Sequence, residues 1–184
     1  MSAKKTNKAE GQNPNKIRKD GNNDKKSNIK FEFFNHYNNP EYIMHHDQRA
    51  AVSLKDKNEN RTYRLENDLG HDIVTYRVDG GICKSNDIKK CDFAIYTVDN
   101  HLILIELKGS DYLQAVRQLI SSYNELIKPK KIPLTRLHAR IVLSKARIPD
   151  IKTSEDMKLE RILKLHNGTF KKKSQLLKDK TSEL

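Results

Sequence analysis

The stretch CDFAIYTVDNHLILIELK, residues 91–108, decides the fold because it holds two apolar runs separated by a turn. Apolar runs of this length are typical of strands that are buried on both faces of a sheet. Asp99 and Asn100 favour a turn between the runs, so the stretch predicts an antiparallel hairpin. The second run ends at Glu106 and Lys108, and charges at the end of a buried strand need a partner or a function.

The length of the turn decides which face of the sheet Asp92 takes, because side chains alternate with period two. With a two-residue loop, Asp92 lies opposite Leu107 and points away from both charges. With a three-residue loop, residues 98–100, it lies opposite Glu106. We predict the three-residue loop, since Asn100 tolerates the left-handed conformation that its last position takes. This register pairs Phe93 with Ile105, Ala94 with Leu104, Ile95 with Ile103 and Tyr96 with Leu102.

The segments around the hairpin predict an α/β fold. After the hairpin, apolar residues recur at three- and four-residue steps, which predicts a helix from about Asp111 to Ile127, with Ser110 or Asp111 as its N-cap. The order strand, strand, strand, helix, strand predicts a central mixed β-sheet flanked by helices. Further strands are predicted at 50–54, 61–65, 72–78 and 137–144, and a second helix at 154–166.

The charge of the chain is concentrated at its two ends. The 184 residues contain 36 Lys and Arg against 24 Asp and Glu, a net charge of +12. Residues 1–30 contribute +6 and residues 171–184 contribute +3, which leaves +3 for residues 31–170. We therefore predict a disordered Lys- and Asn-rich tail over 1–30, one folded domain over 31–170 and a basic C-terminal tail over 171–184. The basic ends suit a polyanionic partner, although a compositional bias explains them equally well.

The composition argues against membrane and secreted classes. The sequence contains no apolar stretch of about 18 residues and no signal-peptide pattern, so we expect a cytoplasmic protein without a membrane partner. Cys83 and Cys91 match no zinc-binding spacing and are expected to be reduced thiols.

The chemistry of the hairpin follows from placing Asp92 opposite Glu106. Two adjacent carboxylates repel one another unless a cation lies between them, and Mg²⁺ is usually held by one or two carboxylates and a substrate phosphate. Lys108 projects from the same face and is expected to stay protonated, as an electrostatic partner and not a general base. A metal that activates water, beside an ammonium that steadies developing negative charge, suits phosphodiester hydrolysis.

Asp92, thirteen further residues, then Glu106-Leu107-Lys108 and an amphipathic helix resemble the motif of the PD-(D/E)xK nuclease superfamily. That superfamily includes restriction endonucleases, Holliday-junction resolvases and repair exonucleases. The resemblance covers about residues 73–144 and implies a restriction-endonuclease-like core. It implies that Asp92 and Glu106 bind Mg²⁺, with Mn²⁺ able to substitute, that Lys108 serves catalysis and that the Leu107 carbonyl is a further metal ligand. Cys91 stands where the name-giving proline would be.

Further acidic residues are candidates for the same site. Asp79 ends a predicted strand that shares an edge of the sheet with Asp92, so it is a candidate metal ligand, or else a turn-forming residue before Gly80. The resemblance also implies an acidic residue on a preceding helix, for which Glu66 and Asp72 are the candidates.

Two groups of polar residues follow the motif. Gln114 and Gln118 lie one helical turn apart and opposite the apolar stripe; because some exonucleases of the superfamily use a helical glutamine, Gln118 is a candidate catalytic residue. Lys145 and Arg147 follow the strand at 137–144, where they could contact nucleic-acid phosphates or simply form a solvated loop.

The sequence therefore predicts an Mg²⁺-dependent nuclease that acts on nucleic acid, DNA rather than RNA, and the resemblance allows a homodimer. The alternative is a catalytically inactive nuclease-fold module that binds nucleic acid or a protein partner. Two further alternatives are a strand-end salt bridge between Glu106 and Lys108 without chemistry, and a structural protein whose basic tails bind RNA.

Overall fold

The computed structural model describes residues 1, 32–55, 60–84, 87–144 and 152–184. The predicted N-terminal tail, apart from Met1, lies outside the described residues. In chain order the elements are α1 (Glu32–His36), the 3-10 turn η1 (Pro40–Tyr42), β1 (Ile43–Asp47), β2 (Ala51–Lys55), β3 (Thr62–Glu66), β4 (Ile73–Arg77), β5 (Phe93–Thr97), β6 (His101–Lys108), α2 (Tyr112–Leu126), β7 (Arg136–Leu143), α3 (Ser154–Leu165), β8 (Phe170–Ser174), β9 (Leu176–Lys180) and the 3-10 turn η2 (Thr181–Glu183).

The strands form two sheets. A six-stranded sheet has the order β1-β4-β5-β6-β7-β8, and a three-stranded sheet has the order β2-β3-β9. In the larger sheet the pairs from β1 to β6 are antiparallel, whereas β6, β7 and β8 run parallel. The prediction of an α/β fold with a central mixed sheet is therefore confirmed.

The hairpin of β5 and β6 has the predicted register. Phe93 lies opposite Ile105 and Tyr96 opposite Leu102, with the two intervening pairs as expected. Asn100 takes a φ of 62°, which is the left-handed conformation that its place in the loop requires. Its side-chain oxygen also accepts a hydrogen bond of 2.8 Å from the Tyr96 hydroxyl, so the turn is fixed to the strand before it.

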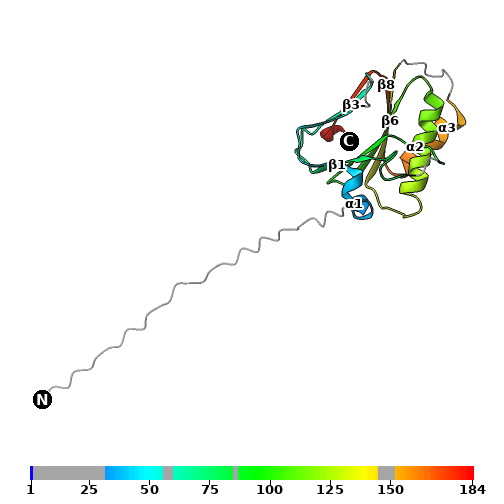
Figure 1. The fold of residues 1–184 in the computed structure, drawn as a ribbon. Coiled ribbons are helices and arrows are strands. Elements are labelled where there is room, and N and C mark those ends of the chain that lie inside the picture. Colours follow the sequence, from blue (N-terminus) through cyan, green and yellow to red (C-terminus); the bar gives the residue numbers. More distant parts are fainter. Residues whose placement is uncertain (2–31, 56–59, 85–86, 145–151) are drawn as a thin grey trace.

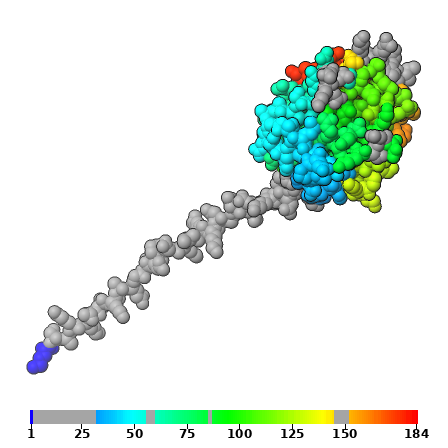
Figure 2. All heavy atoms as spheres, in the orientation of Figure 1, coloured from blue at the N-terminus to red at the C-terminus, as the bar shows by residue number. Residues whose placement is uncertain are grey.

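The larger sheet is covered on both faces, but by different layers (Figure 1). One face packs against α1, α2 and α3 in a core that includes Phe33, Tyr76 and Leu119. The other face packs against the three-stranded sheet, and residues such as Ile103 and Leu65 fill the space between them. The helices thus flank only one face, and β2 and β3 of the smaller sheet (cyan) lie on the opposite side of the molecule in Figure 2.

The two long helices begin at side-chain caps. The Asp111 carboxylate accepts a hydrogen bond from the backbone N–H of Gln114 and caps α2, as the sequence predicted. Thr153 and Asp156 form a reciprocal capping box at the start of α3. Asp111 lies three residues after Lys108, so this cap places the start of α2 directly beside the end of β6.

The prediction of a basic tail over residues 171–184 is wrong, because this segment forms β8, β9 and η2. Period-two alternation explains the difference: in β9 the side chains of Leu177 and Asp179 are buried, and those of Lys178 and Lys180 point outward. Asp179 is 1% exposed and forms an ion pair with the fully buried guanidinium of Arg140 on β7. The chain end is therefore part of the core between the two sheets. No helix among the described residues is long and apolar enough to cross a membrane.

Candidate active site at the end of β6

A pocket of about 390 Å³ opens at the edge of the larger sheet where β6 ends and β5 begins. The loop between β4 and β5 and the first half of α2 form its walls. The pocket brings together most of the residues that the sequence singled out. Its lining consists of Asp79, Ile88, Lys89, Asp92, Glu106, Leu107, Lys108 and Gln118.

Asp92 lies immediately before β5 and is fixed to the neighbouring strand. Its Oδ2 accepts a hydrogen bond of 2.7 Å from the backbone N–H of Leu107. Its carbonyl oxygen accepts a second bond, of 2.9 Å, from the backbone N–H of Val78 just beyond β4. The aspartate is thus held between two strands, and its carboxylate lies at the same end of the sheet as Glu106, as the three-residue loop predicted.

Glu106 is the buried acid of the pocket. Its side chain is 1% exposed, and its Oε2 has no hydrogen-bond partner among the described residues. Burial, together with the negative charge of Asp92, raises the pKa of Glu106 to about 9, although the nearby Lys108 acts in the opposite direction. A buried carboxyl oxygen without a partner is costly, so this position is suited to a ligand that supplies positive charge.

Lys108 is oriented by the helix that follows it. Its Nζ donates a hydrogen bond of 2.8 Å to Oε1 of Gln118 and lies 3.8 Å from Oε1 of Glu106. The amide nitrogen of Gln118 in turn donates a bond of 2.8 Å to the carbonyl of Lys90. The glutamine therefore ties the lysine of β6 to the loop before β5, and the ammonium is held at the mouth of the pocket.

Gln118 is in the pocket, but the interpretation that it lies opposite the apolar stripe of α2 is wrong. Its side chain is 6% exposed. Ala115 and Ser122 are buried on the same side of the helix, one turn before it and one turn after it. Because Ala115 and Ser122 are small, this side of the helix does not show as apolar in the sequence, although it is buried. The sequence pattern therefore gave no sign that Gln118 is buried.

The Leu107 carbonyl faces the pocket by strand geometry. Successive carbonyls of a strand point to opposite sides, and the Lys108 carbonyl accepts a bond from the N–H of Ser144 after β7. The N–H and the carbonyl of Leu107 therefore point to the other neighbouring strand, β5. On that side the N–H donates its hydrogen bond to Asp92. The Leu107 carbonyl is therefore directed toward the side of β6 on which Asp92 lies, and Leu107 lines the pocket.

Asp79 lies in the wall of the same pocket, in the turn that follows β4. Gly80 next to it takes a φ of 70°, so the turn-forming interpretation of this segment also holds. The negative charge of Asp79 is one of the weaker influences that raise the pKa of Glu106. Glu66 and Asp72 do not line the pocket: Glu66 ends β3 in the smaller sheet, and Asp72 precedes β4 at the opposite end of the larger one. Neither supplies the acid on a preceding helix.

The structure adds residues to the site that the sequence did not indicate. Ile88 and Lys89 line the pocket, and Lys90 is 3% exposed with its carbonyl bound to Gln118. These residues precede Asp92 in a loop with no regular pattern, so only their closeness in sequence to Asp92 could have suggested them. Lys145 and Arg147, predicted to contact nucleic acid, lie outside the described residues.

The chemistry of the pocket fits a hard divalent cation. Mg²⁺ prefers oxygen donors. The pocket offers two carboxylates, one of which has a buried oxygen without a partner, and a backbone carbonyl. Within the described residues no group of three or more His, Cys, Asp or Glu side chains is arranged to hold a metal ion. A cation at this site would therefore take part of its coordination from water or from a bound phosphate.

Comparisons with protein-family models, with curated proteins and with solved structures find no match for this chain.

Proposed function

We propose that the protein is an Mg²⁺-dependent nuclease with a restriction-endonuclease-like core, which hydrolyses phosphodiester bonds in DNA rather than RNA. The observation that carries the proposal is the buried Glu106 carboxyl, with one oxygen lacking a partner, in one pocket with Asp92 and Lys108. A structural salt bridge would not require a second acid beside a buried glutamate. A site that binds a cation and a phosphate accounts for all three groups.

Each residue of the pocket has a defined part in this proposal. Asp92 and Glu106 hold the divalent cation, with the Leu107 carbonyl as a further ligand, and the cation keeps Glu106 ionised despite its burial. When bound, the cation supplies an activated water and neutralises charge on the phosphate oxygens. Lys108, oriented by Gln118, stabilises the negative charge that develops on the scissile phosphate.

The experiment is a cleavage assay on plasmid, linear duplex and single-stranded DNA and on RNA, with Mg²⁺, with Mn²⁺ and with chelator. We expect metal-dependent cleavage of DNA, and a loss of at least about 100-fold in Lys108→Ala and Glu106→Ala proteins. Lys164→Ala is the matched control, because Lys164 is an exposed lysine of α3 away from the pocket. Cleavage that survives in both pocket variants excludes this site.

A second candidate function is a catalytically inactive module of the same fold that binds nucleic acid or a protein. Two observations favour it: the Asp92 carboxylate already accepts the N–H of Leu107, and the described residues contain no three-acid group for a metal. The two functions predict different responses to divalent cations. Divalent cations should raise the melting temperature of a nuclease through Glu106 and Asp92, whereas an inactive module should show neither this shift nor cleavage.

A further inference from the structure

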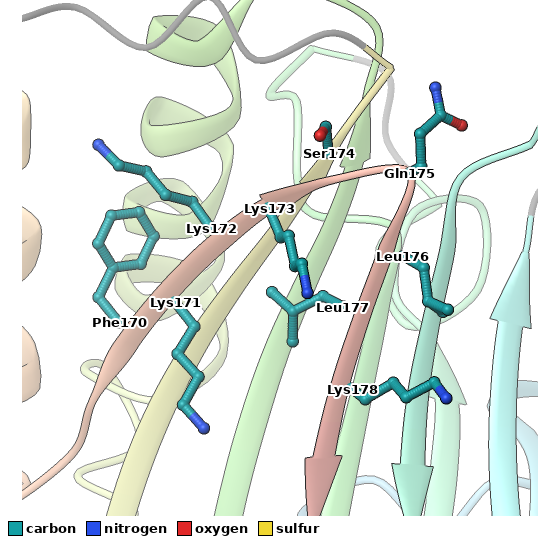
Figure 3. Close-up of a pocket in the computed structure, with 9 residues that line it drawn as sticks. All are labelled: Phe170, Lys171, Lys172, Lys173, Ser174, Gln175, Leu176, Leu177 and Lys178. Atoms are coloured by element: carbon teal, nitrogen blue, oxygen red, sulfur yellow. The ribbon is translucent and has the colours of Figure 1, made fainter.

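We infer that the groove between β8 and β9 binds the phosphodiester backbone of the nucleic acid whose bond lies in the pocket. The groove has a volume of about 810 Å³ and is lined by residues 170–178, FKKKSQLLK (Figure 3). This inference rests on the proposed function for the nature of the ligand. Its own observations concern a different part of the surface, which the sequence had assigned to a tail.

The groove exists because the two strands belong to different sheets. β8 is the last strand of the six-stranded sheet, and β9 is the last strand of the three-stranded sheet. Gln175 joins them in a tight turn with a φ of 65°. Because the sheets lie face to face, their edges part below this turn and leave an open channel, and Figure 3 shows Lys173 and Leu177 pointing into it.

The charge of the groove suits a polyanion. Within the described residues Lys173 has no ion pair, and its exposed side chain points into the groove, whereas the exposed Lys178 points to the outer face of β9 (Figure 3). Lys171 is already paired with Asp179 at 2.7 Å, and Lys172 lies over the ring of Tyr112. Two acids pair with Lys171: Asp179, which is buried and also neutralised by Arg140, and Glu183, whose exposed carboxylate lies 4.0 Å from the ammonium. Lys173 is then the positive charge of the groove that no acid among the described residues neutralises.

The groove also lies on the same edge of the fold as the candidate active site. Lys108, Leu143 and Ser174 are partners in register across β6, β7 and β8. Two interstrand spacings of about 4.8 Å place the Cα atoms of Lys108 and Ser174 about 10 Å apart, which corresponds to roughly three steps of about 3.4 Å along one strand of DNA. The pocket lies on the helix face of the six-stranded sheet, the face on which Lys172 contacts Tyr112, whereas Lys171 and Lys173 face the smaller sheet. A backbone bound at both places therefore passes around this end of the sheet.

The link between the two places is firmly held. The Gln175 amide donates a hydrogen bond of 2.6 Å to the carbonyl of Ser144, whose own N–H is bonded to the carbonyls of Lys108 and Gly109. The turn between β8 and β9 is thus tied to the end of β6 through Ser144. Phosphate contacts in the groove would fix the position of the nucleic acid relative to the pocket without reading its sequence.

The test measures binding to a fluorescein-labelled DNA duplex by fluorescence anisotropy, with the full chain in chelator so that no cleavage occurs. The groove variant is Lys173→Gln, and the control is Lys164→Gln, an exposed lysine of α3 whose replacement changes the net charge equally. Each lost phosphate contact lowers the slope of log K against log salt by about 0.9, so the groove variant should have a slope smaller by about 0.9 when binding is measured from about 50 to 200 mM salt. At about 100 mM salt its affinity should fall roughly five- to ten-fold.

The control should keep the wild-type slope and affinity. An equal loss in both variants would mean that only net charge matters, and would overturn the inference. Unchanged DNA binding in the groove variant would also overturn the inference. The occupant would then be an acidic protein, or the edge lysines would serve only to prevent self-association, which light scattering detects. Because the assay needs no turnover, groove-dependent binding by a protein that never cleaves would support the groove and reject the nuclease.

Discussion

The Asp92 carboxylate accepts a hydrogen bond from the backbone N–H of Leu107, with 2.7 Å between Oδ2 and the nitrogen. This bond joins the start of β5 to the part of β6 that carries Glu106 and Lys108. The position of the first acid therefore does not depend on a bound cation. An amide oxygen can accept the same bond without the negative charge, so Asp92→Asn separates the structural part of this residue from its electrostatic part.

Asp92→Asn should fold as the wild type does and lose its response to divalent cations. Removing one charge relieves the repulsion with Glu106, so the melting temperature in chelator should stay the same or rise by a few degrees. Addition of Mg²⁺ should raise the melting temperature of the wild type but not of the variant. Differential scanning fluorimetry with and without Mg²⁺ measures both effects. An equal Mg²⁺ shift in the two proteins would remove Asp92 from the cation site.

The stability of the metal-free protein should depend on pH through Glu106. Its pKa is raised to about 9 in the folded chain, whereas a glutamate in an unfolded chain titrates near about 4.3. The folded state therefore holds the proton more tightly, so the stabilisation is complete below the unfolded pKa and is lost as the pH rises through the folded value. The free energy of unfolding should fall between about pH 5 and pH 9.

Urea unfolding in chelator across this pH range measures the effect. Glu106→Gln cannot ionise and should flatten the dependence, with a gain of about 1 to 3 kcal/mol over the wild type at about pH 8. The exposed Glu125→Gln is the control and should keep the wild-type slope. A Glu106→Gln protein with the same pH dependence as the wild type would show that another group titrates.

Gln118 should act as a positioning residue for Lys108. Gln118→Leu has a similar size but removes the bond to the ammonium and leaves the Lys90 carbonyl without its donor, at a cost of about 1 to 3 kcal/mol. If the protein is a nuclease, kcat should fall about ten-fold while KM changes little, because the lysine is still present but less well oriented. Gln114→Leu, one turn earlier, should change neither value. Equal kinetic losses in both variants would mean that the helix, not the bond, is affected.

Physical patterns that act over a few residues made the hairpin predictable. The continuous apolar runs defined two interior strands, and Asn100 selected the loop length because few other residues take its conformation readily. The register then followed by counting, and it placed Asp92 next to Glu106 without knowledge of the rest of the chain. The Asp111 cap of α2 was similarly local.

The two C-terminal strands, β8 and β9, and the residues 88–90 were not predictable by the same means. Residues 171–180, KKKSQLLKDK, have the composition of a solvated tail, and their strands form because β3 and β7 provide edges distant in sequence. Asp179 is buried only because Arg140 is buried opposite it, and neither residue predicts the other from its neighbours. Non-local pairing overrides local composition here.

The same buried pair gives the clearest test of the C-terminal strands. Arg140 and Asp179 are both fully or almost fully buried, and Tyr63 donates a hydrogen bond of 3.0 Å to the same carboxylate. Burial alone would raise the pKa of Asp179, but the guanidinium and Lys171 outweigh it and hold the pKa below its usual value. Stability from this carboxylate is therefore present above the unfolded pKa of about 3.9 and is lost as the pH falls.

Asp179→Ala should destabilise the protein by about 3 to 5 kcal/mol, because it leaves the Arg140 charge buried without its partner. The matched variant Lys171→Ala removes an exposed partner of the same carboxylate and should cost about 1 kcal/mol or less. Urea unfolding at neutral pH measures both. A loss below about 1 kcal/mol in Asp179→Ala would mean that β9 does not pack against the six-stranded sheet, and the chain end would then be the tail that its composition suggests.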